Sequence, residues 1–172
     1  MLAATVPPVA AGDGSWMWPV AGPGSGPPSV ASEFDAPDSD YGPGHRGVDL
    51  PTLVGAPVRA VAGGVVAFAG RVAGVDVVTI DHGAERSTYQ PVSAAVSVGD
   101  AVDAGDVIGK VVIGPFHCAS PCLHLGRIAQ AGDRGHLPLA GDYLDPLHRL
   151  SGKTQIRLVD PNGPPPVPPG LS

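Results

Sequence analysis

The spacing of apolar and polar positions predicts short strands joined by tight turns from residue 58 onward. Segments dense in Val, Ile and Ala are interrupted by glycines too often for long helices to form. Turns are expected at Gly63-Gly64, at Arg71–Gly74 and at two similar Gly-Asp segments, 97–102 and 104–107. The expected strands are Val58–Ala62, Gly64–Ala69, Val75–Asp81, Arg86–Pro91, Val107–Ile113 and Leu123–Ala129.

The pattern is less regular at both ends of this region. Trp16–Val20 is a short apolar segment that we expect to pack onto the domain, with Trp16 and Trp18 as core anchors rather than carbohydrate-stacking residues. Residues 21–44 form a long loop rich in Gly, Pro, Ser and Asp, and loops of that length are usually functional or mobile. Tyr143–Leu150 has apolar residues at helical spacing. We therefore expect an all-β fold, mainly antiparallel, with long loops and one short C-terminal helix.

Length and composition fit one domain with tails. The chain has 172 residues, 43% of them hydrophobic, and its 25 glycines and 21 prolines favour turns over helices. We expect a disordered segment at 1–15, one domain at 16–150, and a C-terminal extension with a proline-rich tail at 151–172.

Charge and hydropathy exclude two classes of partner. A net charge of −6 with only 10 basic residues argues against a nucleic-acid surface. No apolar run approaches the roughly 18–20 residues that cross a bilayer, so no transmembrane segment is expected. The apolar N-terminus lacks a basic region and is not a complete signal peptide.

The two cysteines, Cys118 and Cys122, lie close together in the sequence. Three interpretations are open: unrelated core thiols, a metal role for one or both, or a disulfide closing a small loop. The disulfide is favoured, and it places the protein outside the reducing cytosol.

Three residues suggest a metal site. His45 and Asp49 follow a glycine-rich loop, and His124 lies within an apolar strand between two leucines. Zinc binds imidazole nitrogen and carboxylate oxygen, and catalytic sites keep three protein ligands and one open position. The alternative is that both histidines are ordinary hydrogen-bonded residues, since a histidine in an apolar strand needs some partner.

The ordered series of motifs resembles the M23 metallopeptidases, the lysostaphin- or LytM-type peptidoglycan endopeptidases. The resemblance covers roughly residues 16–150. Its motifs are Trp18–Val20 (WPV), Gly44–Leu50 (GHRGVDL), Gly55–Val66 (GAPVRAVAGGVV), Val77–Gly83 (VVTIDHG), Ser87–Tyr89 (STY), Val98–Gly109 (VGDAVDAGDVIG) and Leu123–Leu125 (LHL).

The resemblance implies two β-sheets forming a groove, with a single zinc ion at its floor held by His45, Asp49 and His124. In the family the zinc activates a water molecule for attack on a peptide carbonyl. Two further histidines flank the family's zinc site as general base and oxyanion stabiliser, each role typically worth about 10²–10⁴ in rate.

This chain departs from the family at both flanking positions. Pro91 replaces the histidine of a Tyr-x-His segment, and Cys122 replaces the first histidine of a His-x-His motif. Proline has no ionisable group and no backbone N–H, and a disulfide-bonded cysteine cannot act as a base. Compared with the family pattern, this chain therefore keeps the three metal-ligand residues and lacks the two acid–base histidines beside them.

Three outcomes follow. In the first, the chain is a weak or inactive relative that binds peptidoglycan or regulates a partner cell-wall hydrolase. In the second, it is an active zinc endopeptidase with His117 or His82 as substitute acid–base residue. In the third, Cys122 is a fourth zinc ligand in a structural site. We favour a regulatory, zinc-binding cell-wall domain that acts on or binds peptidoglycan or its peptide stems. We expect it to be extracytoplasmic and monomeric.

Overall fold

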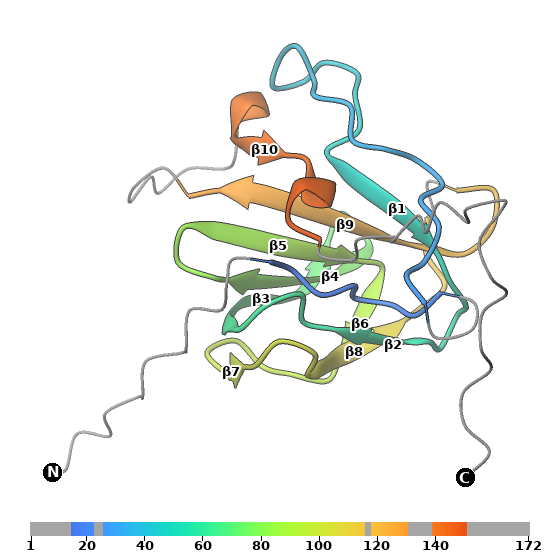
Figure 1. Ribbon diagram of the computed structural model, residues 1–172, viewed down its shortest axis with the longest axis vertical. Helices are drawn as coiled ribbons and strands as arrows, with labels where there is room; N and C mark the ends of the chain where they lie inside the picture. Colours follow the sequence, from blue (N-terminus) through green and yellow to red (C-terminus); the bar gives the residue numbers. More distant parts are fainter. Residues whose placement is uncertain (1–14, 23–25, 116–117, 131–138, 151–172) are drawn as a thin grey trace, which may run out of the picture.

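The computed structural model describes residues 15–22, 26–115, 118–130 and 139–150 of the chain. In this part the fold consists of two antiparallel sheets with almost no helix, as predicted (Figure 1). The segments predicted as a disordered N-terminus (except Ser15) and as a proline-rich extension lie outside the described residues. No helix within the described part is long and apolar enough to cross a membrane.

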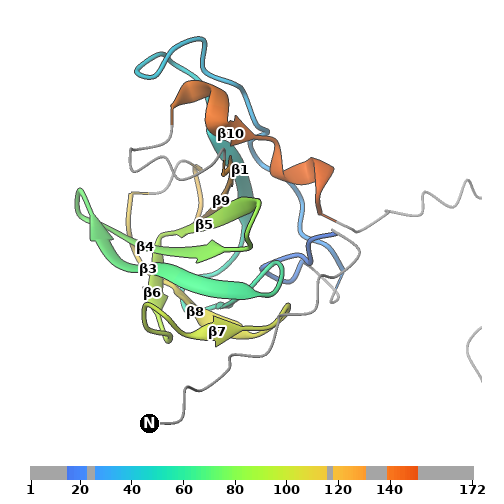
Figure 2. The same cartoon turned by 90° about the vertical axis from the view of Figure 1, so that its left-hand side faces the viewer.

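The larger sheet contains 7 strands, and β10 extends it by pairing with β9 beyond the end of β1. Figure 2 shows its strands following one another in a curve, with the smaller sheet at the β3 end. The larger sheet comprises, in spatial order, β1 (Gly47–Pro51), β9 (Cys122–Ala129), β5 (Glu85–Gln90), β4 (Val75–Asp81), β3 (Gly64–Val72) and β7 (Ala101–Val102), together with β10 (Tyr143–Leu144). The smaller sheet comprises β2 (Pro57–Arg59), β8 (Val107–Val111) and β6 (Val92–Ala94).

Most predicted strands are present with shifted ends, but β1, β6, β7 and β10 are additional, and β7 lies within a segment predicted as a turn. Gly47–Pro51 follows the long loop and forms β1 at the edge of the larger sheet. Its alternation is clear in the structure, because Val48 and Leu50 are fully buried in the core while Asp49 faces the other side. Asp and Pro are uncommon in strands, which weakens the sequence signal for this one.

The predicted C-terminal helix is much shorter than expected. Tyr143–Leu144 is strand β10, and only the 3₁₀ turn η3 (Pro146–His148) is helical in this segment, after the similar turn η2 (Ala140–Asp142). A residue before proline disfavours the α conformation. Asp145 is accordingly extended, with φ −67° and ψ 117°, and its carboxylate caps the turn by accepting from the Leu147 N–H.

Both ends of the described chain meet beside the core. Trp16 is 3% exposed and belongs to the main hydrophobic cluster, and its N–H donates to the Arg149 carbonyl at 2.6 Å. Trp18 is partly buried against the same cluster, so both tryptophans pack as core anchors.

A partly buried ion cluster fastens the C-terminal segment to the sheet. Glu85 on β5 accepts hydrogen bonds from Arg127 on β9, with Nε–Oε2 at 3.0 Å, and from Arg149, with Nη2–Oε1 at 3.0 Å. Arg127 also donates to the Asp145 carbonyl. Burial by itself raises the pKa of Glu85, but the hydrogen bonds and charges of the two arginines outweigh burial and hold that pKa below its usual value.

Candidate metal centre

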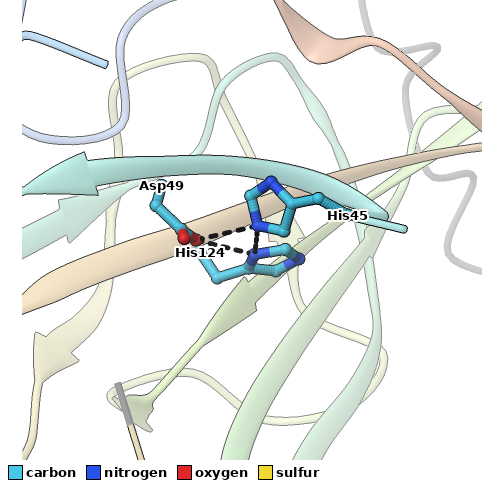
Figure 3. A group of neighbouring side chains, drawn as sticks. All are labelled: His45, Asp49 and His124. Atoms are coloured by element: carbon cyan, nitrogen blue, oxygen red, sulfur yellow. Dashed lines mark hydrogen bonds and ion pairs between the residues drawn. The ribbon is translucent and has the colours of Figure 1, made fainter. Parts of the chain in front are cut away.

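His45, Asp49 and His124 meet at the edge of the larger sheet (Figure 3). The His45 Nε2 atom lies 3.2 Å from Asp49 Oδ1 and 3.1 Å from His124 Nδ1, and the His124 Nδ1 atom lies 2.9 Å from the same Asp49 oxygen. The three atoms thus form a compact triangle of two nitrogens and one oxygen.

The strand register explains why residues so distant in sequence meet. Asp49 on β1 is directly opposite His124 on β9, and residues directly opposite on one face have close Cβ atoms. His45 lies just before β1, where its backbone pairs with Asp35. The ligand-bearing strand is therefore held on one side by β9 and on the other by the loop, since Ser32 also bridges to Asp49.

One glycine makes the close approach possible. A Cβ atom on Gly47 would lie 2.3 Å from the Leu125 carbonyl oxygen and 2.7 Å from His124 Nε2. Backbone and imidazole already occupy that space, so any side chain at this position displaces the His124 ring.

The loop also fixes which nitrogen of His45 faces the other two residues. His45 Nδ1 lies 2.7 Å from the Glu33 carbonyl oxygen, and a carbonyl only accepts, so Nδ1 carries the proton. In a ring with that single proton, the Nε2 atom directs a lone pair toward the Asp49 carboxylate. A lone pair facing a carboxylate is favourable when a proton or a cation lies between them, and outer hydrogen bonds of this kind orient metal-binding histidines.

These donors fit a zinc ion. Atoms about 2.0–2.1 Å from a tetrahedral zinc lie about 3.3 Å from one another, close to the observed separations of 2.9, 3.1 and 3.2 Å. Asp49 is fully buried and His124 is 9% exposed, and buried charged groups need pairing or a metal. His45, Asp49 and His124 could therefore hold one zinc.

The triangle opens into a pocket of about 560 Å³. Gln90 of β5, which pairs with His124, contributes to the wall. Two charged residues that the sequence did not single out, Glu33 and Arg46, also line it. Both belong to a loop without periodicity, so only their nearness to His45 in the chain was a signal. The lining residues are Ser32, Glu33, Gly44, His45, Arg46, Asp49, Gln90 and His124.

Pro91 and Cys122, which the resemblance leads us to expect at the positions of the flanking histidines, both make structural contacts. Pro91 is buried after β5, and its carbonyl accepts the Val112 N–H at 3.2 Å. Cys122 is 2% exposed and is bonded to Cys118, as favoured from the sequence. Neither residue presents a titrating group to the pocket in this state.

His82 does not join the triangle. Its Nδ1 lies 2.8 Å from the Gly63 carbonyl and its Nε2 lies 2.8 Å from Ser87 Oγ, which in turn contacts Tyr89 Oη at 2.9 Å. Ser87 and Tyr89 are fully buried, on the opposite face of β5 from Gln90. Burial lowers the pKa of His82, against smaller opposing effects of Gly63, Asp81 and Glu85. The other predicted substitute, His117, lies outside the described residues.

Comparisons with known proteins agree with this architecture. The model of the family described as "Peptidase family M23" matches residues 43–135, which include the whole triangle. The chain is 43% identical over 154 residues to the uncharacterized protein Rv2891 of Mycobacterium tuberculosis, covering 88% of this chain and 57% of that protein. The chain thus spans a little over half the length of the curated relatives it matches.

Two solved structures share the fold. The catalytic domain of the antimicrobial peptidase lysostaphin from Staphylococcus simulans aligns with a TM-score of 0.57 and 25% identity, over 70% of this chain and 90% of that one. Helicobacter pylori Csd3 aligns with a TM-score of 0.60 and 25% identity, over 80% of this chain and 33% of that one. From the family match and the shared architecture, the chain belongs to peptidase family M23.

Proposed function

We propose that this chain is an extracytoplasmic, zinc-binding cell-wall domain that binds peptidoglycan or its peptide stems, with little or no hydrolysis of its own. In this role it regulates a partner hydrolase. One observation carries the proposal: three candidate metal donors converge beside an open pocket. The family resemblance adds the expectation that Pro91 and Cys122, which is bonded to Cys118, stand in place of the family's flanking histidines.

The zinc part of the proposal rests on the donor set. His45 and His124 supply neutral nitrogens and Asp49 supplies the negative charge, with Glu33 orienting the His45 ring. A zinc bound there supplies Lewis-acid chemistry to a water or a carbonyl oxygen. The pocket beside it has room for a peptide segment.

The weak-hydrolysis part rests on proton handling. Peptide hydrolysis requires a group that takes a proton from water and a group that stabilises the oxyanion. Pro91 can do neither, and the Cys122 sulfur in its disulfide carries no exchangeable proton. Each missing role is typically worth about 10²–10⁴ in rate.

The extracytoplasmic part rests on the disulfide. Bonds such as Cys118–Cys122 persist in oxidising compartments and are rare in the reducing cytosol. Peptidoglycan lies in the same compartments, which supports the wall as partner.

A second candidate function is an active zinc endopeptidase with substitute acid–base residues. One observation favours it: Glu33 is among the residues that line the pocket beside the triangle. A glutamate carboxylate is one of the groups that can serve as general base. Of the two histidines predicted for this role, His82 is engaged on the far face of β5.

The test incubates the zinc-loaded protein with purified peptidoglycan and measures co-sedimentation and release of soluble fragments. We expect co-sedimentation with little release. Rapid release that His124→Ala and Glu33→Gln both abolish would establish the endopeptidase instead. Protein that neither sediments with the wall nor releases fragments would contradict the cell-wall role itself.

A further inference from the structure

The Cys118–Cys122 disulfide lies close to the candidate metal centre. The sulfur atoms of both cysteines and a carboxylate oxygen of Asp49 all lie within 4.8 Å of one another. Asp49 is also one corner of the triangle with His45 and His124. A disulfide and a carboxylate of the candidate metal centre therefore lie within one small volume.

We propose that this disulfide is a redox control on the metal centre, and that its reduction releases Cys122 as a fourth protein donor to the metal. The inference rests on the zinc site proposed above. In the oxidised chain His45, Asp49 and His124 leave one position of a tetrahedral ion open. In the reduced chain Cys122 fills that position and closes the site.

The strand geometry favours Cys122 over Cys118 as the donor. Cys122 is the first residue of β9, two residues before His124, so both side chains lie on the same face of the strand. Its backbone is fixed opposite Pro51 of β1, the strand that carries Asp49. Cys118 lies outside the strands. A change of side-chain rotamer at Cys122 moves the freed sulfur without moving β9.

The chemistry of the donor set supports the same assignment. Zinc binds thiolate sulfur at about 2.3 Å and commonly takes mixed cysteine and histidine ligands. A disulfide sulfur carries no negative charge, and the thiolate is the form that ligates metals. Reduction thus converts a poor donor beside Asp49 into a strong one.

The redox step balances with a dithiol as reductant. The dithiol gives two electrons and two protons, the S–S bond breaks into two thiols, and the dithiol becomes a cyclic disulfide. Cys122 then loses its proton to solvent as the sulfur–metal bond forms. A site closed by four protein donors has no position for water or substrate. The metal centre is consequently closed in a reducing compartment and opens where the disulfide forms.

Two single substitutions test the role of each cysteine separately and need no reductant. Cys118→Ser leaves Cys122 as a permanent free thiol, and the matched control Cys122→Ser leaves only Cys118. Cobalt(II) is the probe, because thiolate ligation gives a sulfur-to-cobalt charge-transfer absorption band. Zinc affinity is measured by chelator competition on the same proteins. Wild-type protein gives the same comparison with no substitution. One sample is oxidised, and the other is reduced with a dithiol that is then removed under anaerobic conditions.

We expect the charge-transfer band in Cys118→Ser and in reduced wild type, and its absence in oxidised wild type and in Cys122→Ser. Zinc affinity should rise with the band by at least about tenfold, since even outer-shell partners change affinity by about 10–100-fold. Metal bound with equal affinity and no band in every form would overturn the redox control and leave the proposed zinc site standing. A band in Cys122→Ser alone would overturn the assignment to Cys122. If oxidised wild type binds neither metal, the zinc site itself is wrong.

Discussion

Two partly buried polar clusters each include one residue of β9, His124 in one and Arg127 in the other, and they compensate the charge of a carboxylate in different ways. Each places one carboxylate between two nitrogen-bearing side chains. Glu85 is held by Arg127 and Arg149, whose guanidinium groups carry permanent positive charge. Asp49 is held by His45 and His124, whose charge depends on protonation. The first cluster is complete in the chain, and the second is suited to an added cation.

The surroundings of the two clusters also differ, one being structural and the other open to a pocket. The arginine cluster also binds the Asp145 carbonyl and so fastens the C-terminal segment to the sheet. The histidine cluster opens into the pocket of about 560 Å³. The carboxylate paired with two arginines therefore has a structural role here. The carboxylate that lies between two histidines beside a pocket is the candidate functional site.

The largest expected effect comes from placing histidines at Pro91 and Cys122, the two positions at which we propose that the family's acid–base residues are replaced. The variant Pro91→His with Cys118→Ser and Cys122→His should raise peptidoglycan hydrolysis by at least about 10²-fold, the usual value of one such role. Fragment release from purified walls measures the gain. Adding His124→Ala to this variant is the control and should abolish it. A folded, zinc-bound variant with no gain would show that the missing histidines do not limit hydrolysis.

Breaking the arginine cluster should cost stability and leave the metal centre intact. Glu85→Gln removes the charge that two arginines share, and we expect a loss of about 2–4 kcal/mol, below the full value for a buried pair because Arg149 is partly exposed. Urea unfolding measures this loss. The matched control Asp81→Asn removes the partner of Arg86 in an exposed pair at 3.7 Å and should cost at most about 1 kcal/mol. Equal losses of unfolding free energy in the two variants would show that the Glu85 cluster contributes no more to stability than the Asp81–Arg86 pair.

Zinc should stabilise the fold through the histidine cluster alone. At a free concentration of 100 times Kd, a ligand that binds only the folded state adds about 2.7 kcal/mol. The same increment is expected in Glu85→Gln, because the two clusters share no partner and independent sites add. Unfolding with and without zinc measures it. A much smaller increment in Glu85→Gln would mean that the clusters are coupled.

The smallest effect is the pH dependence. The lowered pKa of His82 means that the unfolded chain binds its proton more readily, so this contribution to stability is full above about pH 6.5 and falls below it. The lowered pKa of Glu85 acts at more acidic pH: its contribution is full above about pH 4.5 and is lost below. The difference between wild type and His82→Gln, measured by unfolding at pH 5 to 8, isolates the first contribution. A pH-independent difference would contradict it.

The sequence predicted the β class and most strands because glycines separate the apolar runs cleanly. It missed β1, where Asp49 and Pro51 weaken the strand pattern although the alternation of Val48 and Leu50 is present. It overestimated the C-terminal helix because apolar spacing at 143–150 took no account of the extended residue before Pro146.

The site was predictable only in part. The motif order pointed to His45, Asp49 and His124, which the fold brings together. Glu33 and Arg46 could not be found, because their place beside the triangle depends on how the loop pairs with β1 rather than on any periodic pattern. The disulfide was favoured from spacing, but its nearness to Asp49 follows only from the pairing of β9 with β1.

The central claim is that His45, Asp49 and His124 form a metal centre. Zinc stoichiometry and affinity of the oxidised, purified protein test it most directly, with His124→Ala and Glu85→Gln as the compared variants. We predict one zinc per chain in wild type and in Glu85→Gln, and an affinity at least about 100-fold weaker in His124→Ala, beyond the usual cost of losing an outer-shell partner. Wild type without zinc, or His124→Ala that keeps it with unchanged affinity, would contradict the claim.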